Sequence, residues 1–171
     1  YNWWKRRERN QRIIHFFHVM NIISSYSKDT KTKKQSSGSY EWWYFDAQSV
    51  DGYKLVVIFY DGNPFSRRYI QAITNGSSTL ASEYPAISIS VYKGDQPIYY
   101  SFREVDIQSA EFSSMLPNGR VEKNQFEGRS HQTRFEYKLI LDQTLPNGDS
   151  IKADLLFSTD LRSSPTFPKS D

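Results

Sequence analysis

Three of the four carboxylates between residues 39 and 61 lie among aromatic side chains. Glu41 and Asp46 belong to the run "SYEWWYFDA", residues 39 to 47, and Asp61 ends the run "YKLVVIFYD". A carboxyl group in an apolar pocket loses hydration, which raises its pKa and keeps it protonated near neutral pH. Aromatic ring faces stabilise a nearby cation by roughly 0.5 to 2 kcal/mol. The stretch therefore could supply an acid, with Asp46 as the first candidate and Glu41 and Asp61 behind it.

The same stretch supplies the side chains that we predict to contact a ligand. They are Trp42, Trp43, Tyr44, Phe59 and Tyr60. Core packing is the structural alternative for each of them, because 37% of the residues are apolar and 16% are aromatic, so large rings must supply much of the core. The acids have structural alternatives too: Asp46 as a capped or turn-facing carboxylate, and Glu41 as an ion-pair partner for a Lys or Arg such as Arg67 or Arg68.

Several kinds of site are excluded by the remaining composition. The chain has no cysteine, which rules out disulfides, thiolate metal sites and cysteine nucleophiles. His131 is the only histidine beyond residue 20 and lies in a polar stretch, so we predict no metal site. No P-loop, G-x-G-x-x-G motif or Ser-His-Asp set is found. We therefore expect neither a metal nor an organic cofactor.

Charge is distributed unevenly along the chain. Residues 1–38 hold nine Lys or Arg against two acids, whereas residues 39–171 hold thirteen against seventeen. The positive charge thus lies in a polar leading segment and not on a folded face with interleaved aromatic residues. We expect no nucleic-acid partner.

The chain length of 171 residues predicts one domain with a sizeable core. Residues 1–19 form either a non-native upstream segment, with Met20 as the natural start, or a leader with a charged and an apolar region. Residues 20–38 are predicted to be a flexible polar linker, and residues 39–160 a β-domain. Residues 161–171 have the Pro-punctuated, polar composition of an interdomain segment, which predicts a truncated chain.

The pattern from residue 39 onward predicts strands throughout and no helix. Short apolar or alternating runs are separated by turn residues, and we place strands at 40–48, 53–60, 67–74, 86–93, 97–104, 121–127, 133–142 and 150–158. Evenly spaced antiparallel strands favour an all-β fold, either a lipocalin-like barrel or a sandwich. The expected architecture is the first of two such domains, with the second absent.

Turn residues separate the predicted strands. "SVDG" at 49–52, "DGNP" at 61–64, "YKGDQP" at 92–97 and "LPNG" at both 116–119 and 145–148 each supply a Gly or Asn that can adopt positive φ. The repeated "LPNG" indicates either an internal duplication or one turn used twice. Asp61 and Asn63 have the alternative of forming a turn, and "NGS" at 75–77 is also expected to be a turn.

The first two predicted strands form a hairpin that is apolar on both faces. With a four-residue loop at 49–52, Asp46 faces Leu55, Tyr44 faces Val57, Trp42 faces Phe59 and Glu41 faces Tyr60. One face then carries Trp42, Tyr44 and Asp46 with Leu55, Val57 and Phe59. The other face carries Glu41, Trp43 and Phe45 with Val56, Ile58 and Tyr60. Since an antiparallel sheet normally keeps one face in water, we expect a second domain beyond Asp171, another subunit or a membrane surface to cover the outer face.

The run "YEWWYFDA" followed by "DGYKLVVIFYDGNPFS" resembles the N-terminal part of the carotenoid 1,2-hydratase (hydroxyneurosporene synthase) family. The resemblance is strongest over residues 39–73, and "YPAISISVYKGDQPIYYSF" is a weaker match. Tocopherol cyclases and fungal Diels-Alderases are similar in architecture. The resemblance implies two lipocalin-like β-domains that bind a long apolar substrate. The positions proposed as catalytic in the family match the later half, so none is carried over here.

This resemblance implies a bacterial lyase that adds water to a carbon–carbon double bond of an apolar polyene. The expected partners are a lipophilic polyene or isoprenoid ligand and a missing C-terminal β-domain, and the expected location is the cytoplasm, with association to a membrane surface as an option. Two other functions stay open: a non-catalytic module that binds a lipophilic ligand, and a cyclase of the related type. A binding module needs the same aromatic surface but no acid.

Overall fold

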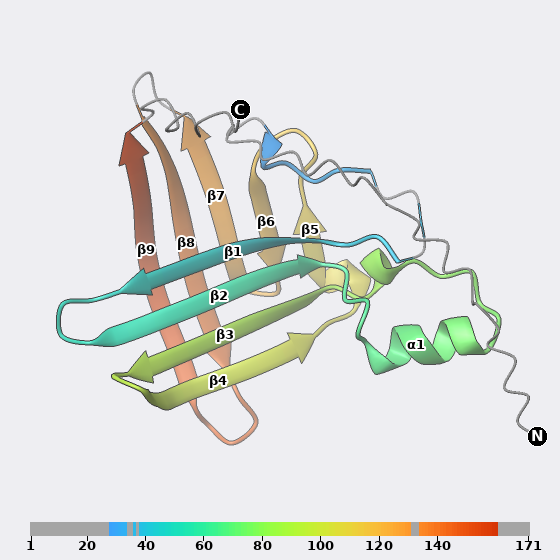
Figure 1. Cartoon of the computed structure of the whole chain (residues 1–171), viewed down its shortest axis with the longest axis horizontal. Helices are drawn as coiled ribbons and strands as arrows, with labels where there is room; N and C mark the ends of the chain where they lie inside the picture. Colours follow the sequence, from blue (N-terminus) through green and yellow to red (C-terminus); the bar gives the residue numbers. More distant parts are fainter. Residues whose placement is uncertain (1–27, 34–35, 37, 131–133, 161–171) are drawn as a thin grey trace, which may run out of the picture.

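The computed structural model describes residues 28–33, 36, 38–130 and 134–160, which form two antiparallel sheets packed face to face. Figure 1 shows the first sheet crossing in front of the second, with the α-helix Arg67–Thr74 beside one end of the first sheet. The first sheet has the order β1-β2-β3-β4 and the second the order β5-β6-β7-β8-β9. The prediction of an all-β fold is confirmed, and the sheets form a sandwich and not a closed barrel.

Every strand pair is antiparallel and joins neighbours in the sequence. The strands of the first sheet are β1 (Glu41–Gln48), β2 (Tyr53–Asp61), β3 (Ala86–Lys93) and β4 (Gln96–Glu104). Those of the second are β5 (Ala110–Phe112), β6 (Asn118–Val121), β7 (Asn124–Ser130), β8 (Arg134–Thr144) and β9 (Ser150–Asp160). The helices are α1 (Arg67–Thr74), η2 (Ala81–Glu83) and η3 (Ile107–Ser109).

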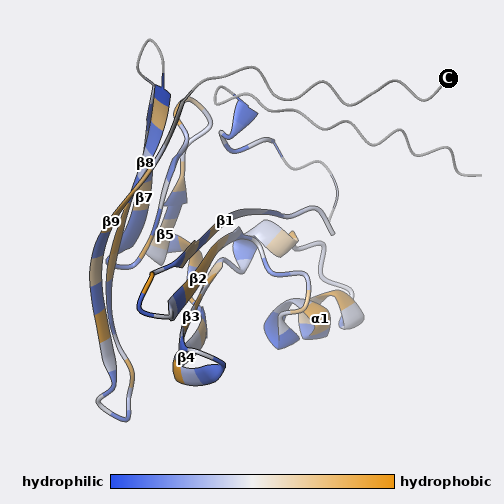
Figure 2. Ribbon diagram, turned by 60° about the vertical axis from the view of Figure 1, so that its left-hand side comes forward, coloured by the Kyte–Doolittle hydropathy of each residue, from blue (hydrophilic) through white to orange (hydrophobic). Residues whose placement is uncertain are grey.

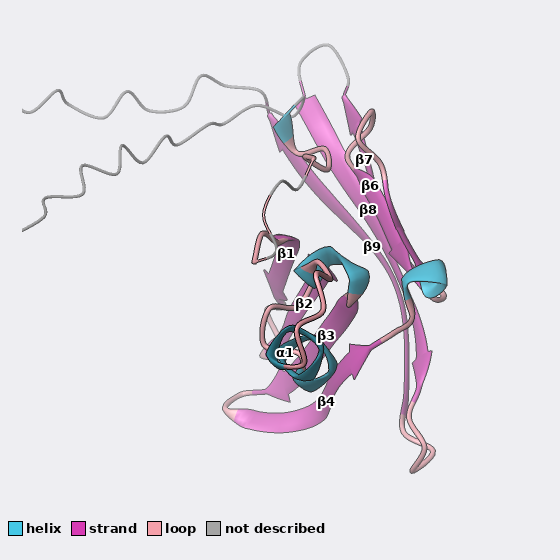
Figure 3. Ribbon diagram, turned by 90° about the vertical axis from the view of Figure 1, so that its right-hand side faces the viewer, coloured by secondary structure: helices cyan, strands magenta, loops and turns pink. Residues whose placement is uncertain are grey.

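The hydrophobic core lies between the two sheets, which Figure 3 shows from the end. The apolar run of β2 appears as a hydrophobic stretch in Figure 2. Phe59 and Phe126 pack edge to face with ring centroids 5.1 Å apart, which joins the first sheet to the second. The buried core residues are Phe45, Val57, Phe59, Ile87, Ile89, Val105, Phe112, Val121, Phe126, Leu139 and Leu141. Aromatic rings thus supply a large share of the contact between the sheets, as the composition indicates.

Six of the predicted strands are confirmed within a few residues, but the prediction for residues 67–74 is wrong because this segment is helix α1. Ser66 caps the helix by accepting a hydrogen bond from the Tyr69 N–H at 3.2 Å. Arg, Gln and Ala in the segment favour helix, and Tyr69 is its buried residue. Tertiary burial of one ring together with this cap outweighs the β propensity of its Tyr, Ile and Thr residues.

The strand predicted at 121–127 is also wrong, because a tight turn at Glu122 and Lys123 divides this segment between β6 and β7. Glu122 has φ 54, in the left-handed region, although nothing but glycine or asparagine usually signals such a turn. The buried Asn124 holds the turn through a hydrogen bond from its Nδ2 to the Val121 carbonyl at 3.3 Å. The short strand β5 was not predicted.

The register of the β1–β2 hairpin differs by one residue from the prediction. Asp46 pairs with Val56, Tyr44 with Ile58, Trp42 with Tyr60 and Glu41 with Asp61. The loop has three residues and not four, because Ser49 already pairs with Tyr53 and Gly52 adopts φ 87. Both faces of the hairpin are nevertheless apolar, as expected.

Part of the predicted linker packs against the sandwich. Lys31 donates its backbone N–H to the Ser113 carbonyl at 2.9 Å, and Asp29 accepts bonds from Trp43 and Tyr137, each at 2.7 Å. His131, Met20 and the segments 1–19 and 161–171 lie outside the described residues. Within the described part of the chain, no helix is long and apolar enough to cross a membrane.

Candidate functional site

A trough lined mainly by aromatic side chains runs over the outer face of the first sheet. Alternation along β1 turns Trp42 and Tyr44 outward and Trp43 and Phe45 towards the core. Trp42 and Tyr44 are each 53% exposed. We call this hollow of about 520 Å³ the outer trough, and its lining residues are Tyr40, Trp42, Tyr44, Ile58, Tyr60, Asn63, Phe65 and Phe102.

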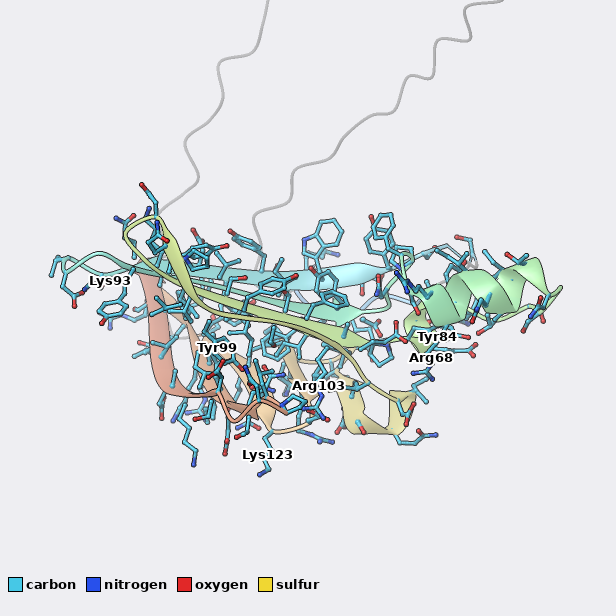
Figure 4. The ribbon with its side chains drawn as sticks, turned by 90° about the horizontal axis from the view of Figure 1, so that it is seen from below. Arg68, Tyr84, Lys93, Tyr99, Arg103 and Lys123 are labelled. Atoms are coloured by element: carbon cyan, nitrogen blue, oxygen red, sulfur yellow. The ribbon has the colours of Figure 1, made fainter. Side chains whose placement is uncertain are left out.

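Strand pairing explains why this face is hollow. One row across the sheet runs from Tyr44 through Ile58 and Ser88 to Phe102. Large rings therefore stand on β1 and β4, while β3 presents the short Ser88 between them. Three strand spacings separate these walls, about 14 Å in all. Figure 4, which views the molecule from below, shows ring-bearing side chains standing out from the outer face of this sheet.

One end of the outer trough is formed by the loop after β2. Asn63 is buried, and its Oδ1 accepts a hydrogen bond from the Phe65 N–H at 3.1 Å, so the predicted turn role of Asn63 is confirmed. This turn places Phe65 outward with 80% of its surface exposed. The ring of Tyr60 lies 5.8 Å from that of Phe102 across the trough. Burial, with the nearby Tyr100 as a smaller cause, raises the pKa of Tyr60 above 10.0, so its phenol is neutral at neutral pH.

Two of the five predicted ligand contacts lie outside the outer trough, Phe59 in the core and Trp43 packed against it. Trp43 stacks on Phe112 with centroids 4.8 Å apart and planes at 6°, and its Nε1–H donates to the Asp29 carbonyl at 2.7 Å. Phe59 is fully buried. The packing alternative therefore describes the surroundings of Trp43 and Phe59, whereas Trp42, Tyr44 and Tyr60 line the outer trough.

Asp46 lies near the hairpin end of β1, on the same face as Trp42 and Tyr44. Its side chain is exposed, and its carboxylate has no hydrogen-bond or ion-pair partner among the described residues. Asp46 also borders a second hollow, of about 360 Å³, at the free edge of β1. The Asp46 carboxylate is therefore in contact with solvent and lies at the end of the row formed by Trp42 and Tyr44.

Glu41 and Asp61 lie together at the opposite end of β1. They are paired across β1 and β2, about 17 Å along the strand from Asp46. Glu41 accepts hydrogen bonds from the Thr32 N–H and hydroxyl, and Arg68, one of the predicted partners, pairs with Glu104 and Asp106. Asp61 is buried, with its Oδ1 3.2 Å from the Lys31 ammonium. The structure thus brings these two acids together and leaves Asp46 separate.

Several lining residues were absent from the predicted site. Phe102 follows the alternation of Ile98 and Tyr100 along β4, a signal that pattern reasoning could have used. Phe65 follows a proline in a turn, where no periodicity marks its direction. Asp29 lies in the predicted linker, and only the fold brings it to Trp43. Among the described residues, no group of three or more His, Asp or Glu side chains could hold a metal ion.

Comparison with known proteins relates the chain to one curated protein. It is 27% identical over 146 residues to a protein from Chlorobaculum tepidum named hydroxyneurosporene dehydrogenase. The match covers 81% of this chain but 38% of that protein, so the chain spans well under half the length of its relative. No protein-family model matches the chain, and no solved structure matches it. The similarity thus relates this aromatic β-sandwich to a protein of carotenoid biosynthesis.

Proposed function

We propose that this chain is the part of a carotenoid-processing enzyme that binds the polyene, and that the outer trough is the binding surface. The observation that carries the proposal is the row of exposed rings on an outer sheet face, which is an unusual surface for a soluble domain. The similarity to a protein named hydroxyneurosporene dehydrogenase supports a carotenoid as the ligand class. The rest of the enzyme would lie outside this chain.

The shape of the outer trough suits a long, thin, apolar molecule. Its lining follows β1 through Trp42 and Tyr44 and β2 through Ile58 and Tyr60, and Phe102 of β4 closes one side against Tyr60. Each 100 Å² of apolar surface that a ligand and the trough remove from water contributes about 2.5 kcal/mol. Ring faces and edges also suit the π-system of a polyene.

The proposed reaction is addition of water to a carbon–carbon double bond, of the carotenoid 1,2-hydratase type. The Asp46 carboxyl would protonate one alkene carbon, and the cation formed at the other carbon would lie near ring faces of β1. The oxygen of one water molecule would bond to that carbon, and the surplus proton would return to the carboxylate. The relative's name denotes a different reaction, removal of hydrogen, which needs an electron acceptor.

Product analysis distinguishes these two reactions. The complete reading frame is expressed in cells that accumulate an acyclic carotene, and the molecular masses of the extracted pigments are determined by mass spectrometry. We expect a product heavier by one water, whereas loss of two hydrogen atoms would refute hydration. Asp46→Asn should abolish the product while Asp154→Asn, a matched change on the outer side of β9, should not. Full turnover by Asp46→Asn would exclude Asp46 as the acid.

A non-catalytic binding module is the second candidate, and the exposure of Asp46 favours it. Asp46 is open to solvent and does not lie in the closed apolar pocket in which a general acid would be expected. A carrier would bind the carotene through the outer trough and leave it chemically unchanged. In the same cells, carotene that copurifies with the protein without any modified pigment would support the carrier and refute the enzyme.

A further inference from the structure

The free edge of β1 borders a second hollow whose composition differs from that of the outer trough. It has a volume of about 360 Å³, and each of the described residues that line it is either aromatic or acidic. We call it the edge cleft, and its lining residues are Asp29, Trp42, Trp43, Tyr44, Phe45, Asp46, Tyr137 and Phe157. The edge cleft lies where the first sheet, through β1, meets β8 and β9 of the second.

Asp29 is held at this place by both sheets. Its Oδ2 accepts a hydrogen bond from the Tyr137 hydroxyl at 2.7 Å, and its backbone carbonyl accepts one from the Trp43 indole N–H, also at 2.7 Å. Trp43 belongs to β1 and Tyr137 to β8. The carboxylate is therefore positioned before any ligand arrives, which lowers the cost of binding one.

Aromatic rings form the walls beside this carboxylate. The ring of Phe45 lies 5.5 Å from that of Tyr137, at 68°, and 5.6 Å from that of Phe157, at 48°. Inclined rings present faces in different directions, and each face carries the negative side of the ring quadrupole. An arrangement of several such faces is the geometry in which proteins bind quaternary ammonium groups.

The charge of the edge cleft has one sign. Asp29 and Asp46 contribute carboxylates, and none of the described residues that line the edge cleft is Lys, Arg or His. Asp46 has no hydrogen-bond or ion-pair partner within the described part of the chain. An anion or an uncharged polar molecule would gain little from these walls, whereas a cation would be attracted by both carboxylates and by the rings.

We propose that the edge cleft binds a small organic cation, a molecule with a methylated ammonium group. Its methyl groups would contact the rings of Phe45, Tyr137 and Phe157, and its charge would face Asp29 and Asp46. The proposal does not depend on the carotenoid function, because it is carried by the charge and lining of the edge cleft alone.

Direct titration of the whole chain tests the proposal. Tetramethylammonium chloride is added while tryptophan fluorescence is followed, with sodium chloride at equal ionic strength as the blank. The neutral isostere tert-butanol serves as the matched ligand control. We expect a saturable change with tetramethylammonium and an affinity for the isostere weaker by about tenfold or more.

Two variants locate the site. Asp46→Asn should weaken tetramethylammonium binding by about fivefold, because it removes one of two charges and keeps the side-chain shape. Asp154→Asn, an exposed aspartate on β9 outside the edge cleft, should leave the affinity unchanged. Because Asp46 is exposed, its variant is expected to fold, and a circular dichroism spectrum checks this. Equal affinity for the cation and its isostere, or equal affinity of Asp46→Asn and the parent chain, would overturn the proposal.

Discussion

The adjacent tryptophans Trp42 and Trp43 should differ sharply in their contributions to stability, because β1 turns one outward and the other inward. Replacing a buried tryptophan by alanine costs about 3 to 5 kcal/mol. Trp43 is half-buried, stacks on Phe112 and donates a hydrogen bond to Asp29, so we expect a loss of about 3 to 4 kcal/mol. Trp42 is 53% exposed, and its truncation leaves no closed cavity, so we expect about 1 to 2 kcal/mol.

Urea unfolding, followed by far-UV circular dichroism, measures this contrast. With a slope of about 2 kcal/mol per molar urea, the midpoint of Trp43→Ala should lie about 1 M below that of Trp42→Ala. Trp43→Phe keeps a ring against Phe112 but loses the indole donor, so its midpoint should lie between the two. Equal losses, or a larger loss for Trp42→Ala, would refute the reasoning, since they would mean that β1 is shifted by one residue.

Other changes test the core, the linker contact and the outer trough. Gly119→Ala should cost about 1 to 3 kcal/mol in urea unfolding, because its new Cβ would lie 2.5 Å and 2.6 Å from two buried phenylalanine rings. Gly38→Ala, which has open space around it, should cost almost nothing. Lys31→Met should cost about 1 to 2 kcal/mol because Lys31 is the partly exposed partner of buried Asp61, and adding Asp61→Asn should recover part of that loss in a double-mutant cycle. Burial raises the pKa of Tyr60 above 10.0, so the folded chain holds the phenol proton more tightly than the unfolded chain does. The stability of the fold should therefore be unaffected below pH 10.0 and should fall as pH rises through the raised pKa. The absorbance difference between the parent chain and Tyr60→Phe should titrate above 10.0.

The alternation of apolar residues was enough to predict most strands and the two apolar faces of the first hairpin. The register was not predictable, because it depends on whether the loop at 49–52 closes with three or four residues. In the structure the loop has three residues, because the Ser49 N–H donates to the Tyr53 carbonyl and Gly52 adopts positive φ. The difference of one residue places Val56, Ile58 and Tyr60, and not Leu55, Val57 and Phe59, on the face of Trp42 and Tyr44. The predicted composition of both faces was therefore wrong for β2, and Phe59 lies in the core.

The repeated "LPNG" shows why a local signal cannot decide a structure alone. At 145–148 it is the expected turn between β8 and β9, with Gly148 at φ 92. At 116–119 its last two residues begin β6, and Gly119 packs where Phe112 and Phe126 leave no room for a Cβ. Gly148 is required for the positive φ of the turn, and Gly119 is required because the core has no space for a side chain there.

The candidate site was predicted in part, because single-strand periodicity shows which residues share a face but not what lies opposite. Trp42, Tyr44 and Tyr60 are in the outer trough, whereas Phe59 is in the core, since the second sheet covers its side of β2. Asp29 could not be assigned to any site from its polar surroundings in the sequence. Its position depends on contacts between segments more than 100 residues apart, as the 108-residue separation of Asp29 and Tyr137 shows.

Equilibrium binding of an acyclic carotene to the chain tests the central claim most directly. The titration compares the parent chain with Trp42→Ala/Tyr44→Ala in the outer trough and with Leu156→Ala, a change at an exposed apolar residue on β9. If the outer trough binds the polyene, the double variant should lose affinity by about tenfold or more, and Leu156→Ala should bind as the parent chain does. An unchanged affinity in the double variant, or an equal loss in Leu156→Ala, would contradict the account.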